Sequence, residues 1–169
     1  GNVAVLKHAS NVPRCADVIA EVLAQAGIPK GVFAALHIDN EQAAEVLRDP
    51  RIAAVTLTGS ERAGRSIAAN AGDQLKKCVM ELGGSDAFIV LEDADLEKTV
   101  AGAVASRFGN AGQTCIAAKR FIVVEAIADA FVQRFVEAAS KLKLGDPQDE
   151  STTLGPMARQ DLRDELHKQ

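Results

Sequence analysis

Short apolar runs alternate along the chain with segments in which apolar residues recur every three or four positions. The short runs predict buried strands, and the periodic segments predict amphipathic helices. Strands are predicted at residues 3–6, 32–38, 52–57, 78–82, 87–91 and 120–124. Because the two patterns alternate from end to end, they predict an α/β fold with mainly parallel sheets.

Polar residues predict where the helices between these strands begin. Ser10 or Asn11 is expected to cap the first helix, with Pro13 in its first turn. The apolar face of that helix is expected to comprise Val12, Ala16, Ile19, Ala20 and Leu23. Later caps are expected at Asp39 or Asn40 and at Asp93 or Asp95.

Two later helices show the most regular apolar periodicity. Their inward faces are predicted to be Leu96, Val100, Val104 and Phe108 in one, and Ile127, Phe131, Phe135, Ala138 and Leu142 in the other. Before them, Gly83 and Gly84 interrupt the alternation, which then restarts with a new strand. We therefore predict parts of two Rossmann-like parallel-sheet domains, residues 1–83 and 84–169. Because the chain opens on an apolar run and ends in a charged amphipathic segment, we expect it to be part of a longer chain.

Composition narrows the classes of function. The 169 residues carry a net charge of −4 with dispersed basic side chains, and the aromatic residues are six Phe without Trp or Tyr. Neither a basic stripe nor stacking platforms are present, so we expect no nucleic-acid partner. No apolar run approaches the roughly 18 residues of a membrane helix, so we expect no membrane partner either.

The three cysteines, Cys15, Cys78 and Cys115, are too few and too scattered for a disulfide framework. They also lack metal-ligand spacing, so no metal is expected and a reducing, cytoplasmic setting is favoured. Cys15 and Cys78 fall within helix and strand patterns, and we interpret both as structural.

Cys115 ends a glycine-rich polar run that includes Asn110 and Gln113. Backbone and side-chain donors beside a sulfur favour its thiolate and can stabilise an oxyanion. A buried structural thiol is the usual state of free cysteine. The chemistry of the loop alone leaves a nucleophile and a structural thiol equally open.

Glu81 ends a predicted strand just before two glycines. It could merely cap a sheet edge. However, ligand crevices in α/β proteins form at the carboxyl ends of strands, and a partly desolvated carboxylate there suits a general base.

A second strand-to-helix turn runs through Gly59, Ser60 and Gly64 and suits an anion or dinucleotide at a helix N-terminus. Many helices begin with Gly-Ser, so this turn alone is a weak signal. Lys7 and Ser10, after the first strand, could meet a ribose or phosphate, or could be an ordinary lysine and a capping serine. The histidines His8, His37 and His167 are interpreted as surface or strand-end residues.

In chain order, these motifs resemble the aldehyde dehydrogenase superfamily over essentially the whole chain. The resemblance rests on Lys7 after a strand, Thr58-Gly59-Ser60, Glu81-Leu82-Gly83-Gly84, Gly112-Gln113-Thr114-Cys115, Gly145-Asp146-Pro147 and Gly155-Pro156. The runs Leu6-Lys7-His8-Ala9 and Leu154-Gly155-Pro156-Met157-Ala158-Arg159 look like a bacterial branch of succinate-semialdehyde dehydrogenases.

The resemblance implies oxidation of a small aldehyde, succinate semialdehyde in that branch, to its acid with NAD or NADP. It implies Cys115 as the nucleophile that forms a thiohemiacetal and then a thioester, and Glu81 as the general base. It also implies a homo-oligomeric full-length protein. An acylating dehydrogenase, or a non-catalytic nucleotide-binding fragment, is the alternative, and we expect the segment alone to be inactive.

The resemblance further implies that Lys7 and Ser10 contact the adenosine ribose region of the cofactor. Gly59, Ser60 and Gly64 would line the pyrophosphate and nicotinamide side, and Leu82 would lie near the nicotinamide amide. Two departures from the family pattern stand out: His8 replaces a common Pro, and Ser10 stands where NAD-preferring members often carry Glu. Serine removes a charge that would repel a 2′-phosphate, so NADP should be tolerated or preferred.

Overall fold

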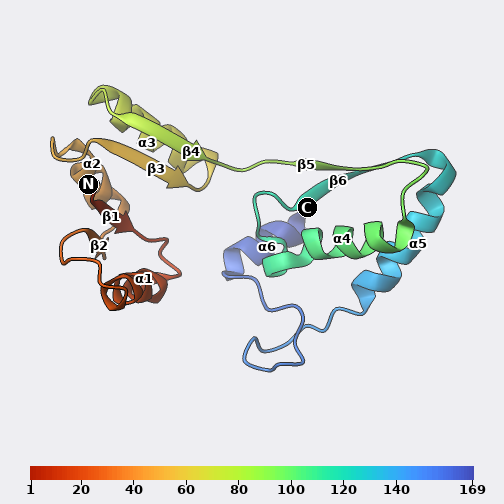
Figure 1. The fold of residues 1–169 in the computed structure, drawn as a ribbon. Helices are drawn as coiled ribbons and strands as arrows, with labels where there is room; N and C mark the ends of the chain where they lie inside the picture. Colours follow the sequence, from red (N-terminus) through yellow and green to blue (C-terminus); the bar gives the residue numbers. More distant parts are fainter. The chain divides into compact units, whose positions relative to one another are not determined.

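The computed structural model describes all 169 residues and divides into two compact units, Gly1–Leu82 and Gly83–Gln169 (Figure 1). Each unit is built from strand–helix–strand segments whose strands pair in parallel. The mixed α/β architecture with parallel strands confirms the fold class predicted from the alternating pattern.

The first unit contains two parallel strand pairs, β1 with β2 and β3 with β4. Its elements are β1 (Ala4–Lys7), α1 (Pro13–Gln25), β2 (Phe33–Leu36), α2 (Asn40–Arg48), β3 (Ala54–Thr58), α3 (Glu61–Asp73) and β4 (Lys77–Glu81). In each pair a helix connects the two strands, α1 in the first and α3 in the second. Parallel strands require such a crossover, and it brings both carboxyl ends to the same edge of the sheet.

The second unit contains one parallel pair, β5 with β6, with a register shift between Asp86 and Ala87. Its elements are β5 (Asp86–Val90), α4 (Leu96–Phe108), the turn Gly109–Gly112, β6 (Ala118–Val123), α5 (Glu125–Ser140) and α6 (Gln160–Lys168). The strands begin or end within two residues of the predicted bounds in this unit.

The best-formed hydrophobic core lies between α4, α5 and this strand pair. Its buried residues are Val90, Val100, Ala103, Val104 and Phe131. Partly buried residues pack against them, including Leu96, Phe108, Ile127, Phe135, Ala138 and Leu142. The two inward faces predicted from the periodicity are therefore confirmed.

Caps formed by aspartate were predicted correctly, but the cap of α1 was not. Asp39 completes a capping box with Gln42, and Asp95 caps α4 by accepting the Lys98 backbone N–H. That hydrogen bond, followed by one from the Lys98 side chain, lowers the pKa of the Asp95 carboxyl.

Helix α1 instead begins after Val12, whose side chain cannot cap, with Pro13 as its first residue. The expected caps, Ser10 and Asn11, lie one or two residues too early. The predicted face of α1 is only partly inward, because Ala16 is buried whereas Ile19 is 45% exposed.

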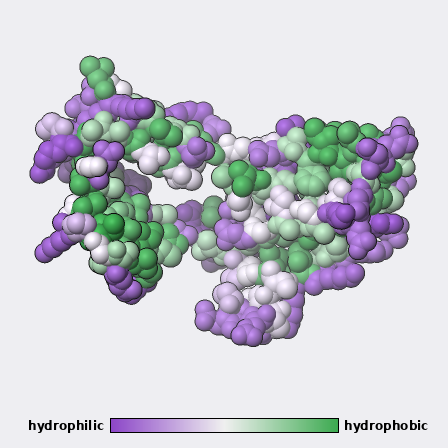
Figure 2. Space-filling view, in the orientation of Figure 1, coloured by the Kyte–Doolittle hydropathy of each residue, from purple (hydrophilic) through white to green (hydrophobic).

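Apolar side chains remain at the surface of both units. Figure 2 shows hydrophobic surface over α1 and over the strands β5 and β6, where Val22, Ile89 and Ile122 are at least half exposed. Cys15 and Cys78 lie within α1 and β4, as the helix and strand patterns predicted, and both are exposed free thiols.

Phe131 is 3% exposed and contacts the rings of Phe121 and Phe135, so its removal should leave a cavity in the second unit. Phe131→Ala is expected to lower the free energy of unfolding by about 3–5 kcal/mol, measured by urea denaturation. Arg134→Ala, on the exposed face of the same helix, should change it by less than about 0.5 kcal/mol. Equal effects of the two substitutions would contradict this account of the core.

Candidate active site

Cys115 lies on a short segment between α4 and β6, whose residues 113–117 we call the Cys115 segment. The preceding turn, Gly109–Gly112, has left-handed backbone at Asn110, Ala111 and Gly112, with φ of 53°, 55° and 75°. We call residues 110–112 the left-handed turn. Cys115 and Ile116 are exposed, whereas Ala117 and Ala118, two and three residues after the cysteine, are buried at 2% and 4% exposure. The thiol is therefore presented to solvent from a segment that is anchored at its end.

Two cations bind the backbone around the thiol. The guanidinium of Arg107 donates to the carbonyls of Gly112 and Ala118, at 2.7 and 2.9 Å. The ammonium of Lys119 donates to the carbonyls of Cys115 and Thr114, at 2.5 and 3.3 Å. Neither residue was predicted from the sequence, because their partners are backbone carbonyls that no residue pattern records.

The polar side chains of the loop form hydrogen bonds with backbone groups. Gln113 donates to the Asn110 carbonyl at 3.1 Å and accepts the Ala158 N–H at 3.1 Å. The Asn110 side chain donates to the Gln113 carbonyl at 3.4 Å. The side-chain donors that the sequence placed beside the sulfur are thus engaged with backbone groups. The backbone amides of the exposed residues Cys115 and Ile116 have no backbone partner and remain as nearby donors.

Glu81 lies at the end of β4 in the first unit, with its side chain exposed. The β3–β4 register pairs it with Thr58, and its carbonyl accepts the Gly59 N–H at 2.9 Å. The strand pairing therefore brings the predicted base and the Thr58-Gly59-Ser60 turn to the same sheet edge, as parallel topology requires.

Ser60 is the N-cap of α3, and its hydroxyl accepts the Ala63 N–H at 3.3 Å. The amides of Glu61 and Arg62 in the first turn have no backbone partner, as is usual at a helix N-terminus. Gly64 is buried on the same helix, and a Cβ there would lie 2.7 Å from Leu82 Cδ2. The structure thus brings together Gly59, Ser60, Gly64, Glu81 and Leu82.

Lys7 and Ser10 follow the other strand pair of this unit. Lys7 is half-buried, pairs in register with Leu36 and makes no ion pair. Ser10 is exposed, and α1 begins without it. The lysine ammonium and the serine hydroxyl are therefore both free to bind a ligand.

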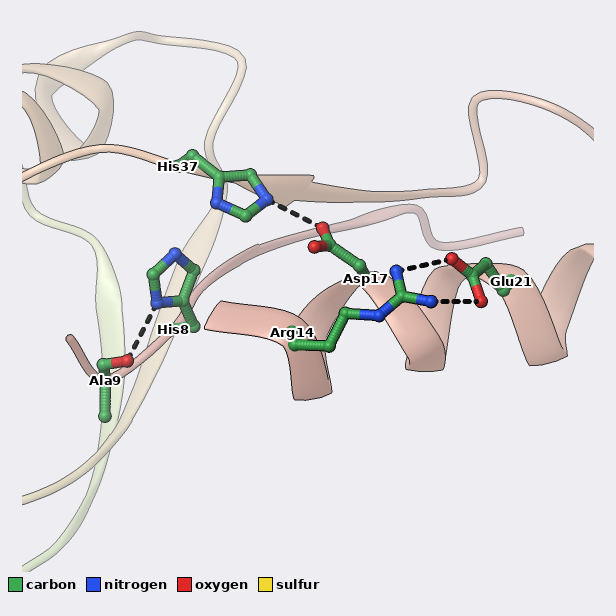
Figure 3. A network of polar contacts seen from close by, with 6 residues as sticks. All are labelled: His8, Ala9, Arg14, Asp17, Glu21 and His37. Carbon is green, nitrogen blue, oxygen red and sulfur yellow. Dashed lines mark hydrogen bonds and ion pairs between the residues drawn. The ribbon is translucent and has the colours of Figure 1, made fainter. Parts of the chain in front are cut away.

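The histidines after β1 and β2 are engaged in a polar network (Figure 3). His37 donates from Nε2 to Asp17 of α1 at 2.7 Å, and its ring lies 4.9 Å from that of His8. His8 Nδ1 lies 2.8 Å from the Ala9 carbonyl, and its enclosed Nε2 has no partner. Both histidines directly follow a strand, as interpreted from the sequence, with His37 exposed and His8 half-buried.

No group of three or more His, Cys, Asp or Glu side chains is arranged to hold a metal ion. None of the helices combines the length and hydropathy needed to cross a bilayer.

Comparison with known proteins identifies the class. The model of the aldehyde dehydrogenase family matches residues 1–169, and this chain belongs to that family. It is 62% identical over its whole length to succinate semialdehyde dehydrogenase [NAD(P)+] Sad of Escherichia coli K12, and covers 37% of that protein. It is 55% identical to the succinate-semialdehyde dehydrogenase [NADP(+)] of Mycolicibacterium paratuberculosis, and covers 36% of it.

Solved structures of similar proteins also match the fold of this chain. Succinic semialdehyde dehydrogenase from Streptococcus pyogenes, in complex with NADP+, matches with a TM-score of 0.95 and 43% identity. The match covers 99% of this chain and 37% of that structure. The chain therefore spans little more than a third of the length of the relatives it matches.

The contact between Gly64 and Leu82 gives a testable coupling. Gly64→Ala gains helix propensity but places a Cβ against the Leu82 side chain. Its effect on the free energy of unfolding should therefore be at least about 1 kcal/mol more favourable when Leu82 is also Ala. Gly72→Ala is the control, because a Cβ there meets nothing within 4 Å and its effect should be independent of Leu82. Urea unfolding of the single and double variants measures both, and additivity at position 64 would contradict the close contact.

Proposed function

We propose that this chain carries the nucleophile and the general base of an NAD(P)-dependent succinate-semialdehyde dehydrogenase. The observation that carries the proposal is the exposed Cys115 thiol on an anchored segment, in a chain 62% identical to an enzyme of that name. The first unit would supply part of the cofactor-binding domain and the second unit part of the catalytic domain.

Cys115 would begin the reaction as the thiolate. Its sulfur attacks the aldehyde carbon, an S–C bond forms, and the carbonyl oxygen becomes an oxyanion. Backbone N–H groups of the exposed loop are suited to stabilise that charge. When bound, NAD(P)+ supplies the hydride acceptor that turns the thiohemiacetal into a thioester.

Glu81 would complete the reaction as general base. It takes a proton from water, the resulting hydroxide attacks the thioester carbon, the S–C bond breaks, and the acid leaves with the thiolate restored. A carboxylate in this role supports water as the acyl acceptor, in preference to a coenzyme thiol.

The residues of the first unit fit a dinucleotide cofactor. The unpartnered amides of Glu61 and Arg62 at the N-terminus of α3 are donors suited to the pyrophosphate. The free ammonium of Lys7 and hydroxyl of Ser10 suit a ribose with or without a 2′-phosphate. Gly59 and Ser60 would line the pyrophosphate, Gly64 would let Leu82 pack closely against the start of α3, and Leu82 would lie near the nicotinamide amide.

The substrate, assembly and compartment of the whole protein are part of the same proposal. We propose a small aldehyde as its substrate, a homo-oligomer as its assembly and the cytoplasm as its compartment. The three free cysteines suit a reducing compartment, and the exposed apolar surfaces of both units suit coverage by further protein.

Substitution of the two proposed catalytic residues tests the mechanism in the full-length enzyme. Cys115→Ala should lower kcat by more than about 10⁴-fold, because no covalent intermediate can form. Glu81→Gln should lower kcat by about 10²–10⁴-fold and let the thioester accumulate, visible as an acyl adduct on Cys115 by mass spectrometry. Cys15→Ala, which removes another exposed thiol, should leave kcat unchanged. Undiminished turnover by the Cys115 variant would refute the proposal.

Cofactor choice is tested at Ser10. Ser10→Glu places a carboxylate where a 2′-phosphate would approach, so the Kd for NADP+ should rise at least about tenfold, while the Kd for NAD+ falls or is unchanged. Ser10→Gln has nearly the same shape without the charge and should leave the preference between the cofactors close to that of wild type. An equal rise for both cofactors in the Glu variant would show that charge at this position does not select the cofactor.

A further inference from the structure

The left-handed turn before the Cys115 segment is disfavoured by its own sequence. Only Gly112 of its three residues lacks a Cβ, and Ala111 at φ 55° has no side-chain group that compensates locally. Asn110 tolerates this conformation better than alanine does. The turn therefore depends on interactions from outside it, and one of these is the hydrogen bond from Arg107 to the Gly112 carbonyl.

Arg107 joins the two flanks of the Cys115 segment. It lies in the last turn of α4, and its two terminal nitrogens donate to Gly112, just before the segment, and to Ala118, just after it. The side chain is half-buried and makes no ion pair with a carboxylate. The planar, charged guanidinium therefore hydrogen-bonds to these two carbonyls at the same time, which its fork of donors allows.

The packing around the guanidinium is close. A Cβ at position 112 would lie 2.7 Å from Arg107 Nη2 and 3.2 Å from the Arg107 carbonyl, so the turn fits closely against this residue. Lys119 holds the carbonyls of Thr114 and Cys115 within the segment, whereas the guanidinium of Arg107 binds a carbonyl on each flank. Ser106, one residue before Arg107, accepts the Ala118 N–H at 3.0 Å and makes no side-chain hydrogen bond to the left-handed turn.

We propose that Arg107 is a positioning residue for the Cys115 nucleophile. It acts by fixing the distance between the two ends of the Cys115 segment, and so the direction in which the thiol points. This inference rests on the proposed function of Cys115. Because attack on a carbonyl requires close alignment, a displacement of about 1 Å in the thiol can lower the rate about 10²-fold.

The test uses three variants of the full-length enzyme. Arg107→Met keeps the length of the side chain but removes both hydrogen bonds, and should lower kcat about 100-fold, with the KM for cofactor within about twofold of wild type. Arg107→Lys keeps the charge but replaces the planar fork with a single ammonium, and should lower kcat about tenfold. Ser106→Ala removes a neighbouring bond to the same residue, Ala118, and should leave kcat within about threefold.

A chemical rescue separates positioning from general stability. Millimolar methylguanidinium should restore a measurable part of kcat in Arg107→Ala, and should have no effect on wild type or Ser106→Ala. Full activity of Arg107→Lys would overturn the inference, because charge alone would then suffice. Equal losses in the Met variant and in Ser106→Ala, or no rescue, would also overturn it.

The same experiments distinguish this inference from the proposed function. If the wild-type full-length enzyme oxidises the aldehyde and Cys115→Ala does not, the proposed nucleophile stands. An Arg107→Met enzyme with wild-type kcat would then refute only the positioning role. A wild-type enzyme that oxidises no aldehyde with either cofactor would refute the proposed function itself.

Discussion

The presentation of Cys115 depends on a backbone turn that is left-handed at three consecutive residues. A left-handed alanine costs about 1–2 kcal/mol, and Ala111 has no local means of recovering it. A hydrogen bond to a charged group contributes about 1.5–3 kcal/mol, so the bond from Arg107 to Gly112 is of the size needed to offset this cost. The conformation of the turn therefore depends on the hydrogen bond from Arg107.

The arginine can hold the turn only because the helix that carries it is itself fixed. Val100 and Val104 of α4 are buried against Phe131 of α5, and Phe108 packs on the same core in the last helical turn. Arg107 thus projects from a helix end that cannot shift without opening the core. The stability of the second unit and the geometry of the proposed nucleophile have a common origin in the packing of α4.

The sequence predicted the parts of this arrangement that follow from local pattern. The inward faces of α4 and α5, the aspartate caps and the parallel strands all follow from periodicity, capping chemistry and the alternation of elements. The cap of α1 was wrong because Pro13 fixes the first helical residue, whereas a serine or asparagine nearby only makes a cap available. Arg107 was missed because its partners are backbone carbonyls, which become neighbours only after the chain has turned at Ala111.

In the first unit, one sheet edge supports two parts of the proposed chemistry. The Gly59 N–H donates to the Glu81 carbonyl, so the peptide that carries the proposed base also directs the chain into α3. Leu82, the next residue, packs against Gly64 in the first turns of that helix. A shift of Leu82 would therefore displace both the end of β4, which carries Glu81, and the N-terminus of α3. A change at Gly64 that alters cofactor binding is also a change to the surroundings of Glu81, and the two effects separate only when cofactor affinity and thioester hydrolysis are measured independently.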